Sequence, residues 1–137
     1  MSVCNEGNEN MRNIIVTTPK TEIENAKKEA EHCLSNGGGY YFRKVHKIPK
    51  DIVIGESKVY YVEDGFIRGF ALVIGCDEKS EKCEVTNKEY NGGIIYMTAS
   101  SWKWIKPIKM KGFQGWRYFD DNNVEIVGDW KDPKPSI

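Results

Sequence analysis

Apolar residues with two different spacings divide the chain into one helix and several short strands. Residues 13–17 form a β-branched run, which predicts a strand. The apolar residues that follow recur at the spacing of one helical face: Ile23, Ala26, Ala30, Cys33 and Leu34. Thr18 and Pro19 suit the start of this helix, and the glycines at 37–39 suit its end. The pattern therefore predicts one amphipathic N-terminal helix.

The rest of the chain alternates between strand-like runs and turn residues. The strand-like runs are residues 40–47, 59–63, 66–75, 94–99 and 124–127, with a short extended piece at 102–104. Asp64 and Gly65 stand between the second and third runs, and this dipeptide is typical of a two-residue hairpin turn. Pro107 is expected to interrupt the extended piece, while the charged residues 77–91 predict a loop or ragged hairpin. Residues 111–117, with two glycines around an aromatic pair, predict a tight loop.

About six strands and one main N-terminal helix predict an α+β fold in which a mostly antiparallel sheet curls into a small β-barrel. A length of 137 residues fits a single domain. We expect residues 1–12 to be a polar, disordered tail, residues 13–130 to form the domain, and residues 131–137 to be an irregular tail. No stretch matches a secretory signal or a membrane span, so we expect a cytoplasmic protein without a membrane partner.

Charged and aromatic residues are unevenly distributed, although the whole chain has 20 basic and 20 acidic residues. Residues 90–119 contain no Asp or Glu and carry five bases, which leaves 15 basic and 20 acidic residues elsewhere. The same segment holds half of the aromatic residues. Aromatic rings stack on bases and cations contact phosphates, so the segment favours nucleic-acid binding. It is equally compatible with a β-rich core whose lysines face solvent.

The binding hypothesis selects stacking rings and the cations beside them. The expected site residues are Trp102, Lys103, Trp104, Lys109, Lys111, Trp116, Arg117 and Tyr118, with Arg43 from a second, smaller aromatic-basic run. Alternation along a strand places Trp102 and Trp104 on the same face, which is either the core or a stacking platform. Trp116 is expected in a loop, where functional side chains concentrate. The expected partner is RNA, or a modified nucleobase or nucleoside.

The cysteines and histidines do not indicate a metal or another cofactor. The chain has four cysteines: Cys4, Cys33, Cys76 and Cys83. Their spacing is not that of a zinc site, and neither His32 nor His46 completes a ligand set. Cys76 and Cys83 flank a charged stretch and could meet across a hairpin. Free thiols are nevertheless expected in a cytosolic protein.

One stretch of the chain resembles a known family. Residues 55–73, GESKVYYVEDGFIRGFALV, resemble the barrel signature of the PUA-like superfamily, in which a Gly-acid turn precedes a strand, a hairpin and a return strand of the pattern x-I-x-G-x-x-x-V. Within that superfamily they are most similar to ASCH and EVE type domains. The resemblance implies that residues 13–130 form a PUA-like pseudobarrel with a helix packed at its opening, and that the protein binds RNA or modified nucleobases. The aromatic strand at 117–119 is a weaker match.

The resemblance assigns roles in this chain only to residues that shape the backbone. Gly55, Gly65 and Gly69 match the hairpin pattern, and Gly69 is expected to let the strand bend or another backbone approach. The turn reads Gly55-Glu56 where Gly-Asp is common, and the G-x-K-x-x-E-x-R motif of ASCH domains is not recognisable. The resemblance therefore assigns no catalytic residues.

Two further functions stay open beside nucleic-acid binding. An amidohydrolase-like enzyme acting on a modified nucleoside would use a carboxylate near the hairpin, such as Glu56, Glu63 or Asp64, with a lysine such as Lys58. A protein-interaction module would instead expose its rings as an apolar patch. No common nucleophile, metalloprotease or phosphate-loop motif is present, so we favour binding over catalysis. The sequence leaves the oligomeric state open.

Overall fold

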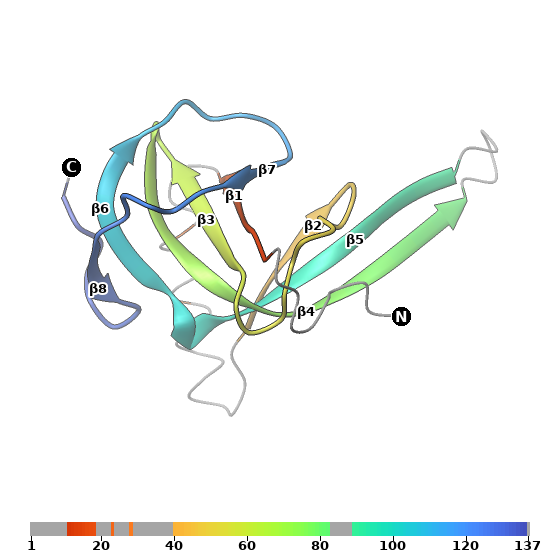
Figure 1. The fold of residues 1–137 in the computed structure, drawn as a ribbon, viewed down its shortest axis with the longest axis horizontal. Helices are drawn as coiled ribbons and strands as arrows, with labels where there is room; N and C mark the ends of the chain where they lie inside the picture. The colour runs from red at the N-terminus through yellow and green to blue at the C-terminus, as the bar shows by residue number, and fades with distance from the viewer. Residues whose placement is uncertain (1–10, 19–22, 24–27, 29–39, 83–88, 137) are drawn as a thin grey trace.

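The protein is described by a computed structural model at residues 11–18, 23, 28, 40–82 and 89–136. Most of these residues belong to eight strands of one curled sheet (Figure 1). In chain order the strands are β1 (Asn13–Thr17), β2 (Tyr40–Val45), β3 (Lys58–Glu63), β4 (Phe66–Lys82), β5 (Glu89–Thr98), β6 (Lys103–Lys109), β7 (Trp116–Phe119) and β8 (Ile126–Asp129). A 3-10 turn, η1 (Ala99–Ser101), joins β5 to β6.

The longest strand, β4, organises the sheet. The strand order is β2-β5-β4-β3-β1-β7, and β6 and β8 branch from β4, because β4 pairs with β6 along its first residues and with β5 further on. β1 and β3 are parallel, and the other pairs are antiparallel. The sheet bends into a half-barrel from which the β4–β5 ribbon projects (Figure 1). The curled, mostly antiparallel sheet agrees with the barrel part of the prediction.

The predicted α+β class is wrong. The described residues form eight strands and one 3-10 turn without a complete α-helix, so the fold they define is nearly all β. The predicted N-terminal helix lies almost wholly outside the described residues. Of its apolar positions only Ile23 is described, and this residue packs into the core. No described helix is long and apolar enough to cross a membrane.

Residues 77–91 were predicted as a loop or ragged hairpin, but residues 77–82 and 89–91, the part that the structure describes, extend strands β4 and β5. The ladder between the two strands runs from Val73 opposite Met97 to Lys82 opposite Glu89. Beyond the residues that pair with β2 and β3, this ladder is a ribbon of only two strands. The charged and polar residues of this ribbon do not alternate with apolar ones, and it is this alternation that predicts a strand. The sequence signal for a strand is therefore weak here.

Strand β6 continues through Pro107, so the predicted interruption is wrong. Pro107 lies in the part of β6 where the pairing with β4 shifts register. The preceding residue, Lys106, bonds on the other side, where its backbone N–H donates to the carbonyl oxygen of Glu125 at 2.8 Å. A proline fits an irregular stretch of this kind because no ladder hydrogen bond from its nitrogen is needed.

The core of the curled sheet consists of two apolar clusters on either side of β1. Ile14 and Val16 belong to the cluster that contains Trp104, whereas Ile15 belongs to the one that contains Tyr60. Alternate residues of a strand point to opposite faces, so β1 is buried on both. The uninterrupted apolar run of this strand follows from its place between β3 and β7.

The predicted hairpin at residues 64–65 is confirmed. Asp64 and Gly65 have φ angles of 52° and 83°, so both have the left-handed backbone of a type I′ turn. Pairing begins directly beside the turn, with Glu63 opposite Phe66. This hairpin holds β3 and the first half of β4 in register and so positions the residues that line the interior.

Cys76 is buried and disulfide-bonded, so the expectation of free thiols is wrong for this residue. The other three cysteines lie outside the described residues. Free thiols were expected because a cytoplasmic location was expected. Disulfides persist mainly in oxidising environments, so the disulfide bond of Cys76 does not support that location. The tail predicted at residues 1–12 also lies outside the described residues, apart from Met11 and Arg12.

Candidate nucleic-acid interface

Strand β7 lies at one end of the sheet order, next to β1. Trp116 is opposite Val16, and Tyr118 is opposite Ile14. Alternation places Trp116 and Tyr118 on one face of the strand and Arg117 on the other. Trp116 therefore begins a strand and does not lie in the predicted loop. The paired strand fixes the direction of its indole more tightly than a loop would.

Four flat groups follow one another along this face, and we call them the β7 ladder. The rings of His46 and Trp116 are nearly parallel, with centroids 6.4 Å apart and planes at 18°. Trp116 meets Tyr118 edge to face at 5.1 Å. The guanidinium of Arg12 lies 4.2 Å above the centre of the Tyr118 ring. His46 is exposed and the other three are partly exposed, while Trp116 and Tyr118 also pack against the core cluster that contains Trp104. The exposed part of the row is accessible to a ligand.

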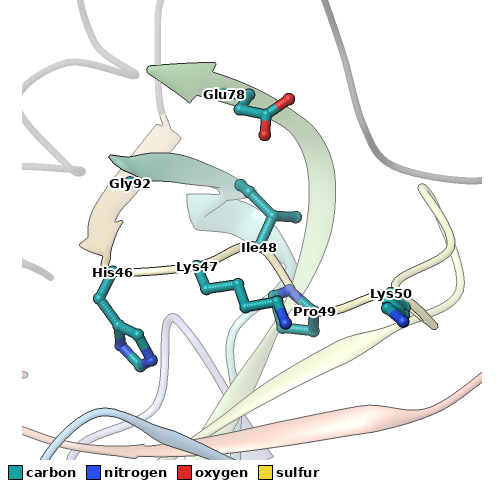
Figure 2. A pocket seen from close by; sticks show the side chains of 7 residues that line it. All are labelled: His46, Lys47, Ile48, Pro49, Lys50, Glu78 and Gly92. Atoms are coloured by element: carbon teal, nitrogen blue, oxygen red, sulfur yellow. The ribbon is translucent and has the colours of Figure 1, made fainter. Parts of the chain in front are cut away.

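The segment after β2 forms a pocket beside the ladder. Trp116 donates its indole N–H to the carbonyl oxygen of Lys47 at 2.7 Å, which fixes the segment on one side. On the other side the segment lies so close to β5 that a Cβ on Gly93 would be 2.4 Å from the Ile48 side chain. The pocket of about 190 Å³ is lined by His46, Lys47, Ile48, Pro49, Lys50, Glu78 and Gly92 (Figure 2). Figure 2 shows Glu78 and Lys47 on opposite sides of Ile48.

Arg12 and the cations of the pocket were not among the predicted site residues. Arg12 was assigned to the N-terminal tail, but its backbone N–H donates to the Asp51 carbonyl at 3.0 Å and its carbonyl oxygen accepts from Ser57 Oγ at 2.8 Å. No local pattern reveals these contacts. The only sequence signal near the pocket is the basic run at 43–47, from which only Arg43 was selected.

Trp102 and Trp104 belong to the core. Of the two possibilities for their shared face, core or stacking platform, the structure therefore shows the core. They are 3% and 1% exposed, and their rings meet edge to face at 5.2 Å. The prediction that Gly69 permits a close approach is confirmed. A Cβ at Gly69 would lie 2.3 Å from the carbonyl oxygen of Lys103 and 2.5 Å from the Trp102 ring. These two indoles therefore form no exposed stacking platform.

The remaining predicted residues lie on several parts of the surface. The guanidinium of Arg117 lies 4.3 Å above the Phe113 ring, on the face of β7 opposite the ladder. Arg43 donates to the carbonyl oxygen of Thr17 at 2.9 Å. The lysines of the predicted site differ in exposure: Lys103 is partly buried, and Lys109 and Lys111 are exposed. Of the nine predicted residues, the structure brings only Trp116 and Tyr118 together in the ladder.

The lysine suggested for a hydrolase is held by a different acid. Lys58 Nζ lies 3.0 Å from Asp121 Oδ2, which also accepts a hydrogen bond from the Tyr60 hydroxyl at 2.7 Å. Burial raises the pKa of Asp121, but the hydrogen bonds from Tyr60 and Lys58 outweigh it and hold that pKa below its usual value. Burial, then the hydrogen bond to Asp121, raises the pKa of Tyr60 above its usual value. The three groups tie β3 to the turn after β7.

The acids of the hairpin do not surround a common lysine. Glu56 and Asp64 are exposed, whereas Glu63 is 1% exposed and contacts Lys134. Glu63 therefore contacts Lys134, and not the Lys58 with which the hydrolase hypothesis paired it. Within the described ranges no group of three or more His, Cys, Asp or Glu side chains could hold a metal ion.

Comparison with known proteins gives no match to a protein-family model, to a curated protein or to a solved structure. The resemblance of residues 55–73 to PUA-like domains therefore stays a prediction.

Proposed function

We propose that the protein binds single-stranded RNA along the β7 ladder. The observation that carries this proposal is the row of His46, Trp116, Tyr118 and Arg12, in which each side chain keeps at least part of its surface exposed. Every base has a π-face, so such a row accepts successive unpaired bases without reading their sequence. Bases inside a duplex are not available for stacking, and the ligand is therefore single-stranded.

The pocket beside the ladder supplies charge for the RNA backbone. Lys47 and Lys50 are exposed at its rim, and Arg12 lies at the far end of the ladder. Stacking contributes about 1 to 3 kcal/mol per base, so two stacked bases with a few phosphate contacts correspond to micromolar affinity. Glu78, on the other side of the pocket, limits where a phosphate can lie.

The proposal is tested by fluorescence anisotropy with a labelled twelve-nucleotide RNA. We expect micromolar binding at low salt, and log K falling with log salt at a slope of about −0.7 for each phosphate contact. Trp116→Ala should weaken binding about tenfold, because one stacking surface is lost. Phe113→Ala is the matched control, since Phe113 contacts Arg117 on the opposite face of β7. Absent binding at low salt, or equal losses in both variants, would contradict the proposal.

A further inference from the structure

The C-terminal segment, residues 132–135, contacts polar side chains in the interior of the sheet. Trp104 of β6 donates its indole N–H to the carbonyl oxygen of Asp132 at 3.1 Å. Arg68 of β4 donates a guanidinium N–H to the carbonyl oxygen of Pro135. Two backbone carbonyls of one short segment are therefore held by buried donors from two different strands.

The side chain between these carbonyls contacts a buried carboxylate. Lys134 donates from its ammonium group to Glu63 Oε1 at the end of β3, and the other carboxylate oxygen accepts the backbone N–H of Ile23 at 3.3 Å. The Glu63 side chain is 1% exposed and that of Lys134 is 23% exposed. The ammonium thus reaches inward from a segment that stays in contact with solvent.

Glu63 and Arg68 are the only charged residues that are buried within the described ranges. Taking a charge out of water costs free energy that an apolar side chain would not, so stability alone does not account for two such residues. Buried ionisable groups with specific partners occur at functional sites. In this protein the C-terminal segment supplies the Lys134 ammonium to Glu63 and the Pro135 carbonyl to Arg68.

A bulge in the sheet directs Arg68 to this place. The pairing of β3 with β4 shifts register after Tyr61: Tyr61 is opposite Gly69 and Val62 is opposite Ile67, so Arg68 is the extra residue of β4 at the bulge. Bulges re-aim a side chain and recur beside functional sites. Arg68 is 3% exposed, so the bulge directs a guanidinium into the interior.

A tight turn at the end of β8 directs the C-terminal segment back over the sheet. The backbone N–H of Asp129 donates to Asp132 Oδ2 at 2.8 Å, and that of Asp132 donates to the carbonyl oxygen of Asp129 at 3.0 Å. The turn fixes where the segment begins. Beyond this turn the segment contacts the sheet through the Lys134 ammonium and the Pro135 carbonyl.

We propose that residues 132–135 occupy, within the same chain, a recognition site for an extended peptide that carries a lysine. Arg68 and Trp104 bind peptide carbonyls, and Glu63 binds the lysine ammonium. Prolines on both sides of the lysine suit such a site, because they lack a backbone N–H that would otherwise need an acceptor. The occupant from outside is a lysine-bearing segment of a partner protein, which displaces the chain's own C-terminal segment.

The test uses the full-length protein and an acetylated, amidated peptide of the sequence DPKPS, which copies residues 132–136. In the variant Lys134→Ala the segment loses its ammonium, so calorimetry should show the peptide binding at least about tenfold more tightly than to wild type. A peptide with norleucine in place of lysine should bind the variant at least about tenfold more weakly. The control variant Lys131→Ala, at an exposed neighbour in the turn, should behave as wild type.

A second measurement on wild type keeps the proposal testable if Lys134→Ala does not fold. The linked segment competes at an effective concentration on the order of millimolar, so millimolar peptide should shift the Trp104 indole signal in proton–nitrogen spectra. An unmoved Trp104 signal, or a folded Lys134→Ala variant that binds neither peptide or both equally, would show that the segment is only a fixed part of the core.

Discussion

The indole N–H of Trp116 donates a hydrogen bond to the carbonyl oxygen of Lys47, 2.7 Å away, and so ties the end strand of the sheet to the segment that follows β2. The same indole lies between His46 and Tyr118 in the β7 ladder. One side chain therefore holds the pocket in place and forms the centre of the proposed RNA surface. These two roles can be separated by substitution.

Trp116→Phe keeps an aromatic face but removes the indole donor. We expect the free energy of unfolding to fall by about 1 kcal/mol, because one hydrogen bond to a backbone carbonyl is lost. RNA affinity should fall less than in Trp116→Ala, since a ring is still present for stacking. Urea denaturation and anisotropy measure the two quantities. If both variants lost RNA affinity equally, the ring would not be the stacking surface.

Arg12→Ala should weaken RNA binding and lower the salt slope by about 1, because one phosphate contact is removed. Lys109→Ala is the informative comparison, since Lys109 is exposed and basic but pairs with Phe66 beside the hairpin, outside the ladder. Anisotropy titrations at several salt concentrations give both slopes. A larger change in Lys109→Ala would favour the site predicted from sequence over the ladder.

Gly69→Ala should lower the free energy of unfolding by about 3 kcal/mol. The added Cβ would lie 2.3 Å from the backbone carbonyl of Lys103 and 2.5 Å from the Trp102 ring, and neither can move without disturbing the core. Gly75→Ala serves as the control because its nearest neighbour, Tyr96, is 3.9 Å away. Urea denaturation compares the two. Similar stabilities would mean that β4 and β6 can separate at little cost.

The pKa of Asp121 predicts how stability changes in acid. The pKa of Asp121 is lower in the folded protein than in the unfolded chain. The ionised carboxylate therefore stabilises the fold at pH values above the unfolded pKa, and this stabilisation is lost as the pH falls through the folded pKa. Asp121→Asn should flatten the dependence of the melting temperature on pH in that acidic window. At neutral pH we expect a loss of about 1 kcal/mol, since Tyr60 retains an acceptor. An unchanged acid profile would contradict the stabilising role of the Lys58 contact.

The elements that could be predicted from sequence are those whose apolar pattern is local. β1, β3 and the hairpin at 64–65 each carry their own signal, because a β-branched run or a two-residue turn depends on neighbours in the chain. The outer part of the β4–β5 ribbon carries no such signal, because its residues are mostly charged or polar and do not alternate with apolar ones. The fold class was wrong because the described residues are nearly all strand, while the predicted helix lies almost wholly outside them.

The candidate site was harder to predict because it depends on strand register. Alternation shows that Trp102 and Trp104 share a face of their strand, and that Trp116 and Tyr118 share a face of theirs, but it does not show how far each face is buried. The first pair is buried, whereas the second packs against the same core cluster and stays partly exposed. Arg12 and His46 join the second pair only because β1 lies beside β7 and because Trp116 holds the segment after β2.

The parallel pairing of β1 with β3 has a consequence for synthesis on the ribosome. β1 is synthesised before both of its partners, which are residues 59–62 and, on its other side, residues 116–119. Ile14 thus lies opposite Val59 and Tyr118, and the pairing of β1 with β7 cannot form until residue 119 has left the ribosome. Contacts so distant in sequence make folding slow. We expect nascent chains that stop before residue 116 to expose an apolar β1 edge and to bind chaperones until β7 is added.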